Sequence, residues 1–138
     1  MIIDKEAAVT LFIKDGLILG ISRRHDKTKY GLIGGGVEEN ETPKQAAIRE
    51  AKEEADLQLN DCKLIFQRVE ESDSQSGYFS IAYCFYAIDW EGIPRSMEEG
   101  EVKWLTVEEL TSTKAAFADY NSATLKAFKI MYPEIALI

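Results

Sequence analysis

The chain has 138 residues and a formal net charge of -8 at pH 7, from 24 acidic and 16 basic side chains. This charge argues against a nucleic acid polymer as partner, because general affinity for such polymers depends on Lys and Arg side chains that neutralise phosphates. The longest apolar run, residues 81–88, is too short to span a bilayer, and the charged N-terminus does not fit a signal peptide. We therefore expect a cytoplasmic protein with no membrane partner, folded as a single domain over residues 1–138.

Two apolar stretches at the start of the chain predict a β-hairpin. Residues 6–14 and 17–22 are separated by an Asp-Gly dipeptide, which favours a type I′ turn because that turn needs positive φ at both central residues. The second strand is followed by two arginines and by residues 25–29 (HDKTK), which we expect to form a polar loop.

The stretch from Gly34 to Leu57 (GGGVEENETPKQAAIREAKEEADL) begins as a glycine-rich turn and continues as an amphipathic helix. Its three glycines allow the backbone to approach a metal or phosphate without an intervening Cβ. Thr42-Pro43 favours a helix start, since threonine supplies a capping oxygen and the missing N–H of proline has no consequence there. We expect the helix to end at Asp56 in a left-handed conformation, at a cost on the order of 1 kcal/mol.

Three glutamates share one face of this helix. Glu50, Glu53 and Glu54 stand at positions i, i+3 and i+4. Like charges at these spacings repel by a few tenths of a kcal/mol per pair, and such a run alone is more often a solvated face than a site. A divalent cation converts the repulsion into binding, because Mg²⁺ takes oxygen ligands from one or two carboxylates and from substrate phosphates.

The spacing around these glutamates follows a known pattern. From Gly35 the chain reads G-x5-E-x7-R-E-x2-E-E, which resembles the Nudix box, G-x5-E-x7-R-E-U-x-E-E-x-G-U, where U is a bulky aliphatic residue. Ala51 stands in place of a bulky aliphatic residue and Asp56 in place of the late glycine. Neither departure removes a charge that the chemistry needs.

The resemblance implies roles for individual residues. It implies a Mg²⁺ site, with Mn²⁺ as an alternative ion, whose ligands are Gly35, Glu50, Glu53, Glu54 and Glu98. Catalysis is expected to depend on Arg49, Glu53, Glu54 and Glu98, and substrate contacts are expected from Arg23, Glu38, Phe117 and Asn121.

Several of these residues also have a simpler interpretation. Arg49, four residues before Glu53, can orient that carboxylate or Glu41, or it can form an ordinary surface ion pair. Glu41 lies at the helix start, where the helix dipole favours a negative charge, and the resemblance implies that it also supports the geometry of the box. Glu38 can be no more than a solvated loop charge, and Arg23 no more than a solubilising residue.

The rest of the chain predicts three further strands and two helices. The expected strands are residues 62–70, 78–90 and 103–105, with a hairpin loop at residues 73–77. A capping box at Thr106 predicts a short helix, and a last helix is expected over residues 122–132, with Leu125, Phe128 and Met131 or Tyr132 facing the core. This order agrees with an α/β/α sandwich around a mixed β-sheet, the Nudix fold.

An acidic loop precedes the late tryptophan strand. The resemblance implies that this loop supplies one more glutamate, and the candidates are Glu98, Glu99 and Glu101. Glu98, six residues before Trp104, fits the MutT-like spacing best, although an acidic loop can also serve solubility alone.

One segment bears on the substrate. Residues 117–121 (FADYN) resemble a segment of MutT-like nucleoside triphosphate pyrophosphohydrolases whose asparagine reads the purine edge. Asn121 offers a donor and an acceptor to a base, and Phe117 or Tyr120 can stack on it. The alternative is that Asn121 only caps the last helix.

We therefore predict a Nudix pyrophosphohydrolase that converts a small-molecule nucleotide, foremost a (d)NTP and with oxidised purines among the candidates, to a nucleoside monophosphate and pyrophosphate. An ADP-ribose or dinucleoside polyphosphate pyrophosphatase is the alternative. A non-catalytic Nudix-like regulatory module is a more distant one, because such modules typically lose box carboxylates. The protein is expected to be a monomer or a homodimer.

Overall fold

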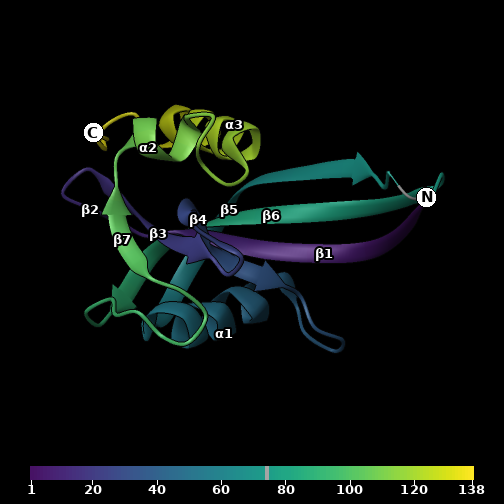
Figure 1. Ribbon diagram of the computed structural model, residues 1–138, viewed down its shortest axis with the longest axis horizontal. Coiled ribbons are helices and arrows are strands. Elements are labelled where there is room, and N and C mark those ends of the chain that lie inside the picture. The colour runs from purple at the N-terminus through teal and green to yellow at the C-terminus, as the bar shows by residue number, and fades with distance from the viewer. Residues whose placement is uncertain (74) are drawn as a thin grey trace.

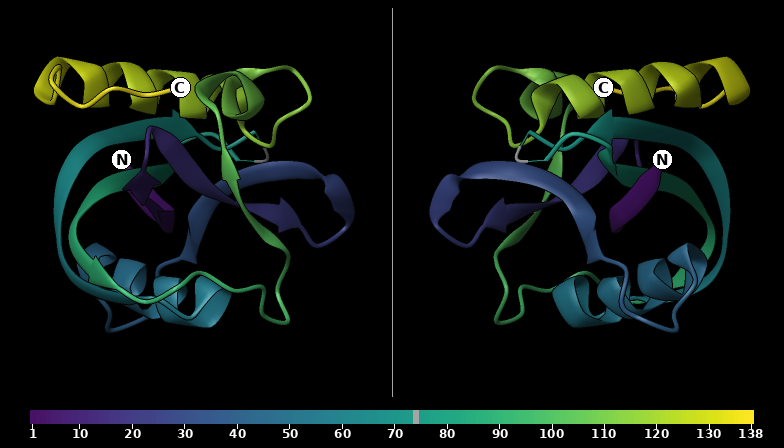
Figure 2. Two further views of the ribbon diagram at one scale, coloured as in Figure 1. Left: turned by 90° about the vertical axis from the view of Figure 1, so that its left-hand side faces the viewer. Right: turned by 90° about the vertical axis from the view of Figure 1, so that its right-hand side faces the viewer.

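A computed structural model describes residues 1–73 and 75–138. The described residues form a curled sheet of seven strands with α1 on one side and α2 and α3 on the other (Figure 1, Figure 2). The strands are β1 (Ile2–Leu11), β2 (Ile13–Lys14), β3 (Leu17–Arg23), β4 (Asp26–Gly36), β5 (Gln58–Glu71), β6 (Tyr78–Glu91) and β7 (Val102–Leu105), and the helices are α1 (Pro43–Ala55), α2 (Val107–Thr111) and α3 (Ala118–Met131). The expected α/β/α arrangement is confirmed.

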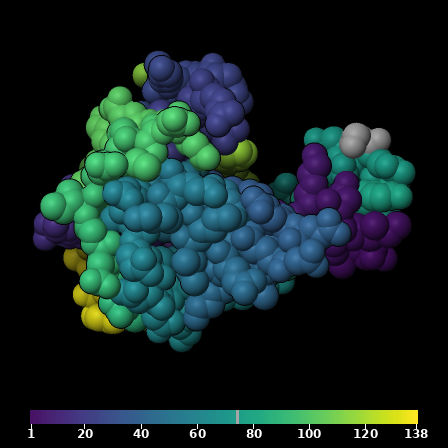
Figure 3. All heavy atoms as spheres, turned by 90° about the horizontal axis from the view of Figure 1, so that it is seen from below, coloured from purple at the N-terminus to yellow at the C-terminus, as the bar shows by residue number. Residues whose placement is uncertain are grey.

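The sheet is mixed. Its strand order is β2-β3-β4-β1-β6-β5, and β7 pairs with β3. Strands β1 and β6 run parallel, whereas every other pair is antiparallel. The start of β1, the end of β5 and the start of β6 project beyond the helices. The N-terminal residues therefore lie on an arm at one side of the molecule (Figure 3).

Strand β1 separates two hydrophobic cores. Because side chains alternate along a strand, Ala8 packs with the core under α1, while Val9 and Leu11 belong to the core under α3. Strand β1 pairs with β4 so that Ala8 lies opposite Gly35 and Val9 lies opposite Gly34. The middle of the sheet therefore positions the glycines directly between the two cores.

Helix α1 begins and ends as expected. Thr42 accepts a hydrogen bond from the Gln45 N–H in a capping box, with proline following it, and Asp56 closes the helix at φ 57° and ψ 38°. The face that docks on the sheet carries small side chains, all buried: Ala46, Ala47, Ala51 and Ala55. Alanines bring the helix close to the sheet, which also brings its glutamates close to β4.

Two expectations around the glycines were wrong. Residues 26–29 are not a loop but the first part of β4, which pairs with β3 across a turn at residues 24–25. This hairpin is largely exposed, so its polar residues carry no apolar alternation that would indicate a strand. Residues 34–36 are likewise the end of β4 rather than a turn. By contrast, the turn before β3 is confirmed, with positive φ at Asp15 and Gly16.

The last helix starts earlier than predicted. Helix α3 begins at Ala118, after Phe117 at φ 58°, so Asn121 lies inside the helix rather than at its cap. Tyr132, not Met131, completes the core side, because its ring packs on Phe128 and Tyr86.

Strand β5 begins four residues before the expected start. Strands β5 and β6 pair as an antiparallel hairpin, and the predicted loop at 73–77 includes Ser74, which lies outside the described residues.

None of the described helices has the length and hydropathy needed to cross a membrane. Cys62 and Cys84 are buried and free.

Replacing Gly34 by alanine is expected to destabilise the protein by about 3 kcal/mol. Gly34 adopts φ +151°, and a Cβ there would overlap the carbonyl oxygen of Ala8 and lie 2.5 Å from the Val9 Cα. Gly36→Ala is the matched control, because a Cβ at that neighbouring position meets nothing within 4 Å. Urea unfolding of both variants measures the effect, and equal losses of stability would contradict this account of the β1–β4 contact.

Candidate functional site

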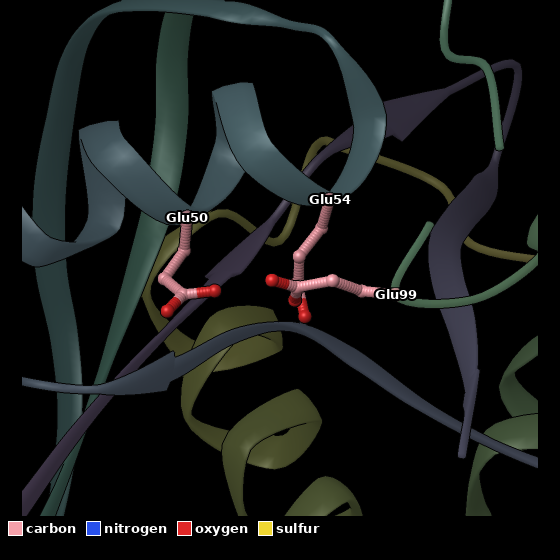
Figure 4. A group of neighbouring side chains, drawn as sticks. All are labelled: Glu50, Glu54 and Glu99. Atoms are coloured by element: carbon pink, nitrogen blue, oxygen red, sulfur yellow. The ribbon is translucent and has the colours of Figure 1, made fainter. Parts of the chain in front are cut away.

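Three carboxylates from two separate elements converge beside the glycines of β4. Glu50 and Glu54 extend from α1, and Glu99 reaches them from the loop before β7 (Figure 4). One oxygen from each lies within 4.8 Å of the others. The fold therefore brings Glu99 next to two carboxyl groups of a helix that is distant from it along the chain.

Burial makes this arrangement costly for charged carboxylates. The residues Glu50 and Glu54 are 8% and 7% exposed. Desolvation, followed by the neighbouring carboxylates, raises the pKa of Glu54 from 4.5 to about 8, although the Gly34 N–H donates to its Oε1 at 2.7 Å. Desolvation also raises the pKa of Glu50. A donor set made only of carboxylate oxygens fits Mg²⁺ or Mn²⁺, and a cation would remove the mutual repulsion.

Arg49 holds the acidic residues around the cluster. Its Nε and Nη2 atoms donate to the two oxygens of Glu41 at 2.9 Å each, and its Nη1 donates to Glu50 at 2.9 Å and to Glu53 at 3.2 Å. Nη2 also reaches the Gly36 carbonyl at 2.9 Å. The guanidinium lowers the pKa of Glu41 to about 2. Arg49 thus contacts both carboxylates, Glu41 and Glu53, that it was predicted to orient.

Three other box residues lie around the cluster rather than in it. The Glu53 side chain is 44% exposed and pairs with Arg49, and Glu38 is more exposed still, 3.5 Å from the same guanidinium. At Gly35, a Cβ would lie 2.7 Å from the Glu50 Oε1. Glycine at this position therefore leaves the space that the carboxylate occupies.

The loop before β7 contributes Glu99, not Glu98, to the cluster. Glu98 and Glu99 are the two central residues of a turn closed by a bridge between Met97 and Gly100. Gly100 packs closely on Ser22, whose Oγ accepts from the Glu101 N–H at 2.9 Å. The number of residues between the turn and Trp104 does not determine whether Glu98 or Glu99 faces the cluster. The signal in the sequence that bears on this loop is Gly100, because a Cβ at that position would lie 2.7 Å from the Ser22 carbonyl oxygen.

A cavity of about 380 Å³ extends from the glutamates to the start of α3. At one end it is lined by Gly34, Gly35, Gly36, Glu54 and Glu99, and at the other by Arg23, Arg24, His25, Phe117, Tyr120 and Asn121. The Arg23 guanidinium lies over the Phe117 ring, 4.9 Å from its centroid. Three of the four predicted substrate contacts thus line one cavity, whereas Glu38 is not among its lining residues.

The Asn121 side-chain amide donates hydrogen bonds to two backbone carbonyl groups. It is 1% exposed, and its Nδ2 donates to the carbonyls of Leu110 at 2.9 Å and Ala116 at 2.8 Å. The prediction that it caps the last helix was wrong, because the helix already begins at Ala118. With both amide hydrogens used, only Oδ1 remains for a ligand in the cavity.

Sequence reasoning missed a second groove that adjoins this cavity. The groove, also of about 380 Å³, shares Ala7, Val9, Phe117 and Tyr120 with the first cavity, and Arg68, Glu70, Ser80, Ile81, Ala82 and Asp119 complete it. Its polar residues belong to β5, β6 and α3, and no local motif joins them. Only the pairing of β5 with β6 and the docking of α3 bring them together.

Comparison with known proteins gives a family and a fold. The model of the NUDIX domain family matches residues 4–126, and no curated protein sequence matches the chain. The E. coli ORF135 protein has a similar solved structure, with a TM-score of 0.77 and 24% identity over 97% of this chain and 94% of that one. A MutT Nudix hydrolase from Burkholderia pseudomallei (TM-score 0.72, 24% identity, 89% and 96% covered) and a C. elegans Ap4A hydrolase (0.68, 20%, 96% and 100%) are also similar.

The raised pKa of Glu54 predicts how the metal-free protein responds to pH. A proton bound by folded Glu54 stabilises the folded state fully below about pH 4.5, and this contribution is lost as the pH rises through about 8. In EDTA, Glu54→Gln is therefore expected to match the wild type near pH 5. At pH 8 it is expected to be more stable by on the order of 1–3 kcal/mol, since glutamine can still accept from Gly34.

Urea unfolding at the two pH values tests this expectation, with the exposed Glu98→Gln as control. Adding Mg²⁺ at pH 8 should raise the melting temperature of the wild type more than that of Glu54→Gln. A glutamine variant that is less stable than wild type at pH 8 would show that the carboxylate is not destabilised there.

Proposed function

Since the chain belongs to the Nudix domain family of pyrophosphohydrolases, we propose that it hydrolyses a nucleoside triphosphate to a nucleoside monophosphate and pyrophosphate. The observation that carries this proposal is the single cavity that joins the carboxylate cluster to the aromatic and amide groups of residues 117–121. A nucleotide needs both ends, because its phosphates seek the cation site and its base seeks an apolar, partly polar wall.

Glu50, Glu54 and Glu99 would hold Mg²⁺ or Mn²⁺, which when bound neutralises phosphate oxygens and activates water for attack on phosphorus. The protein's own groups prepare this site. The Gly34 N–H orients Glu54, and Arg49 orients Glu50. Glu53, exposed and within reach of Arg49, remains a candidate proton acceptor at the rim of the cluster.

The other end of the cavity suits a nucleoside. Phe117 is 61% exposed, so its ring is available for stacking on a base together with Tyr120. Asn121 presents Oδ1 as an acceptor for an N–H of the base, since its amide hydrogens are used by Leu110 and Ala116. The Arg23 guanidinium beside Phe117 supplies a cation to the same region.

The alternative substrate class is a nucleotide with a second large group, such as ADP-ribose or a dinucleoside polyphosphate. The groove that continues the cavity past Tyr120 favours it, because it offers space beyond one nucleoside. A non-catalytic binding module is less well supported, since all box carboxylates are present.

Glutamine at the cluster residues is expected to abolish most turnover. Glu54→Gln and Glu99→Gln should lower kcat/KM by about a hundredfold or more in saturating Mg²⁺, because each removes a charged oxygen ligand. Glu98→Gln is the matched control and should remain close to wild type. A large loss at Glu98 with none at Glu99 would reverse the register assigned to this loop.

A substrate panel with Mg²⁺ tests the proposed reaction. Unmodified and oxidised (d)NTPs, ADP-ribose and dinucleoside polyphosphates should be compared by kcat/KM, with the products identified. We expect a (d)NTP to give the highest value and to release pyrophosphate. Best turnover of ADP-ribose, with AMP and ribose 5-phosphate as products, would favour the alternative, and binding without turnover would favour a regulatory module.

A further inference from the structure

Arg68 of β5 stands in the wall of the second groove and is held there from several sides. Its Nη1 lies 3.0 Å from the Asp119 Oδ2 and 3.6 Å from the Glu70 Oε1. Its guanidinium carbon lies 5.8 Å from the centroids of both the Phe66 and the Tyr120 rings. With its side chain only 26% exposed, Arg68 is a positioned cation rather than a mobile surface charge.

The fixed guanidinium of Arg68 still has N–H donors that are available to a ligand. An arginine carries five N–H donors in a planar fork. In the part of the chain that the structure describes, Nη1 is the only one of its nitrogens with a hydrogen-bond or ion-pair partner. The N–H groups of Nε and Nη2 remain for a ligand that enters the groove beside Tyr120.

We propose that Arg68 reads the base of the substrate and selects guanine and cytosine over adenine and uracil. This inference rests on the proposed nucleotide substrate and names the part of that substrate which the groove recognises. Two adjacent donors of a guanidinium need two adjacent acceptors. Guanine offers O6 and N7, and cytosine offers O2 and N3.

The other bases do not present that edge. In adenine the amino group, a donor, stands next to N7 and next to N1, and in uracil the ring N–H separates the two carbonyls. Oxidation of guanine at C8 places a hydrogen on N7 and removes one of its two acceptors. From the adjoining cavity, the free Oδ1 of Asn121 can accept an N–H of the base. Because all four bases carry such a donor, the selection depends on Arg68.

Steady-state kinetics with GTP, CTP, ATP and UTP test the assignment. The wild type is expected to prefer GTP or CTP by kcat/KM. Arg68→Gln should reduce that preference about tenfold or more, because a bidentate contact to a base is lost. Arg68→Lys keeps the charge but lacks the planar fork, so it should not restore the preference. Arg95→Gln is the matched control, since Arg95 also pairs with an aspartate, at 3.2 Å from Asp56, but lines neither cavity.

Calorimetric binding of GMP, CMP, AMP and UMP gives a readout that does not depend on turnover. Weaker binding of GMP or CMP by Arg68→Gln, with AMP and UMP unchanged, would support the inference. An unchanged order of preference in both Arg68 variants would overturn it while leaving the pyrophosphohydrolase proposal intact. Absence of turnover of every nucleoside triphosphate by the wild type would instead count against the proposed function, and equal wild-type affinity for the four monophosphates would overturn the role of Arg68 independently.

Discussion

The burial of Glu50 and Glu54 beside one another is the constraint on which the site depends. Two carboxylates that are less than a tenth exposed lose hydration and repel each other, so the folded protein carries a local free-energy penalty. The raised pKa values of both groups express that penalty. A divalent cation bound there would relieve it, so the penalty of the metal-free protein and the proposed affinity for a cation would have the same origin.

The surrounding structure maintains this unfavourable contact with short side chains and one arginine. Alanines on the inner face of α1 and glycines at the end of β4 allow the helix and strand to approach until the Glu54 carboxylate accepts from the Gly34 N–H. Arg49 then satisfies the oxygens that face outward, with Glu41 as its main partner. The two cores on either side of β1 pack the helices onto the sheet.

Sequence patterns predicted the elements that carry local signals and missed those set by tertiary contacts. Thr42 and Asp56 bound α1 because capping and left-handed closure are decided by neighbouring residues. The β4 hairpin escaped notice because an exposed strand needs no apolar alternation. Glu99 could not be distinguished from Glu98 by spacing, since the two stand side by side in a turn and only the tertiary contacts of the loop show which of them faces the cluster. The partners of Arg68 come from β5 and α3, and the sequence pattern of one element does not indicate the partners from the other.

The carboxylate cluster and the far end of the cavity with its adjoining groove are built from different parts of the chain, which under the proposed function separates reaction from selection. Helix α1, the end of β4 and the loop before β7 supply the carboxylates and the glycines, whereas the start of α3 supplies rings and an amide oxygen, and β5 supplies the Arg68 guanidinium of the adjoining groove. Strand β1 lies between them and is fixed by both cores. If Arg68 selects the base as proposed, a substitution there would change which base is accepted without moving Glu50 or Glu54. Because the chain is acidic, the phosphates of such a substrate would be attracted chiefly at a cation site, and selectivity would have to come from the shape and hydrogen bonding of the other end.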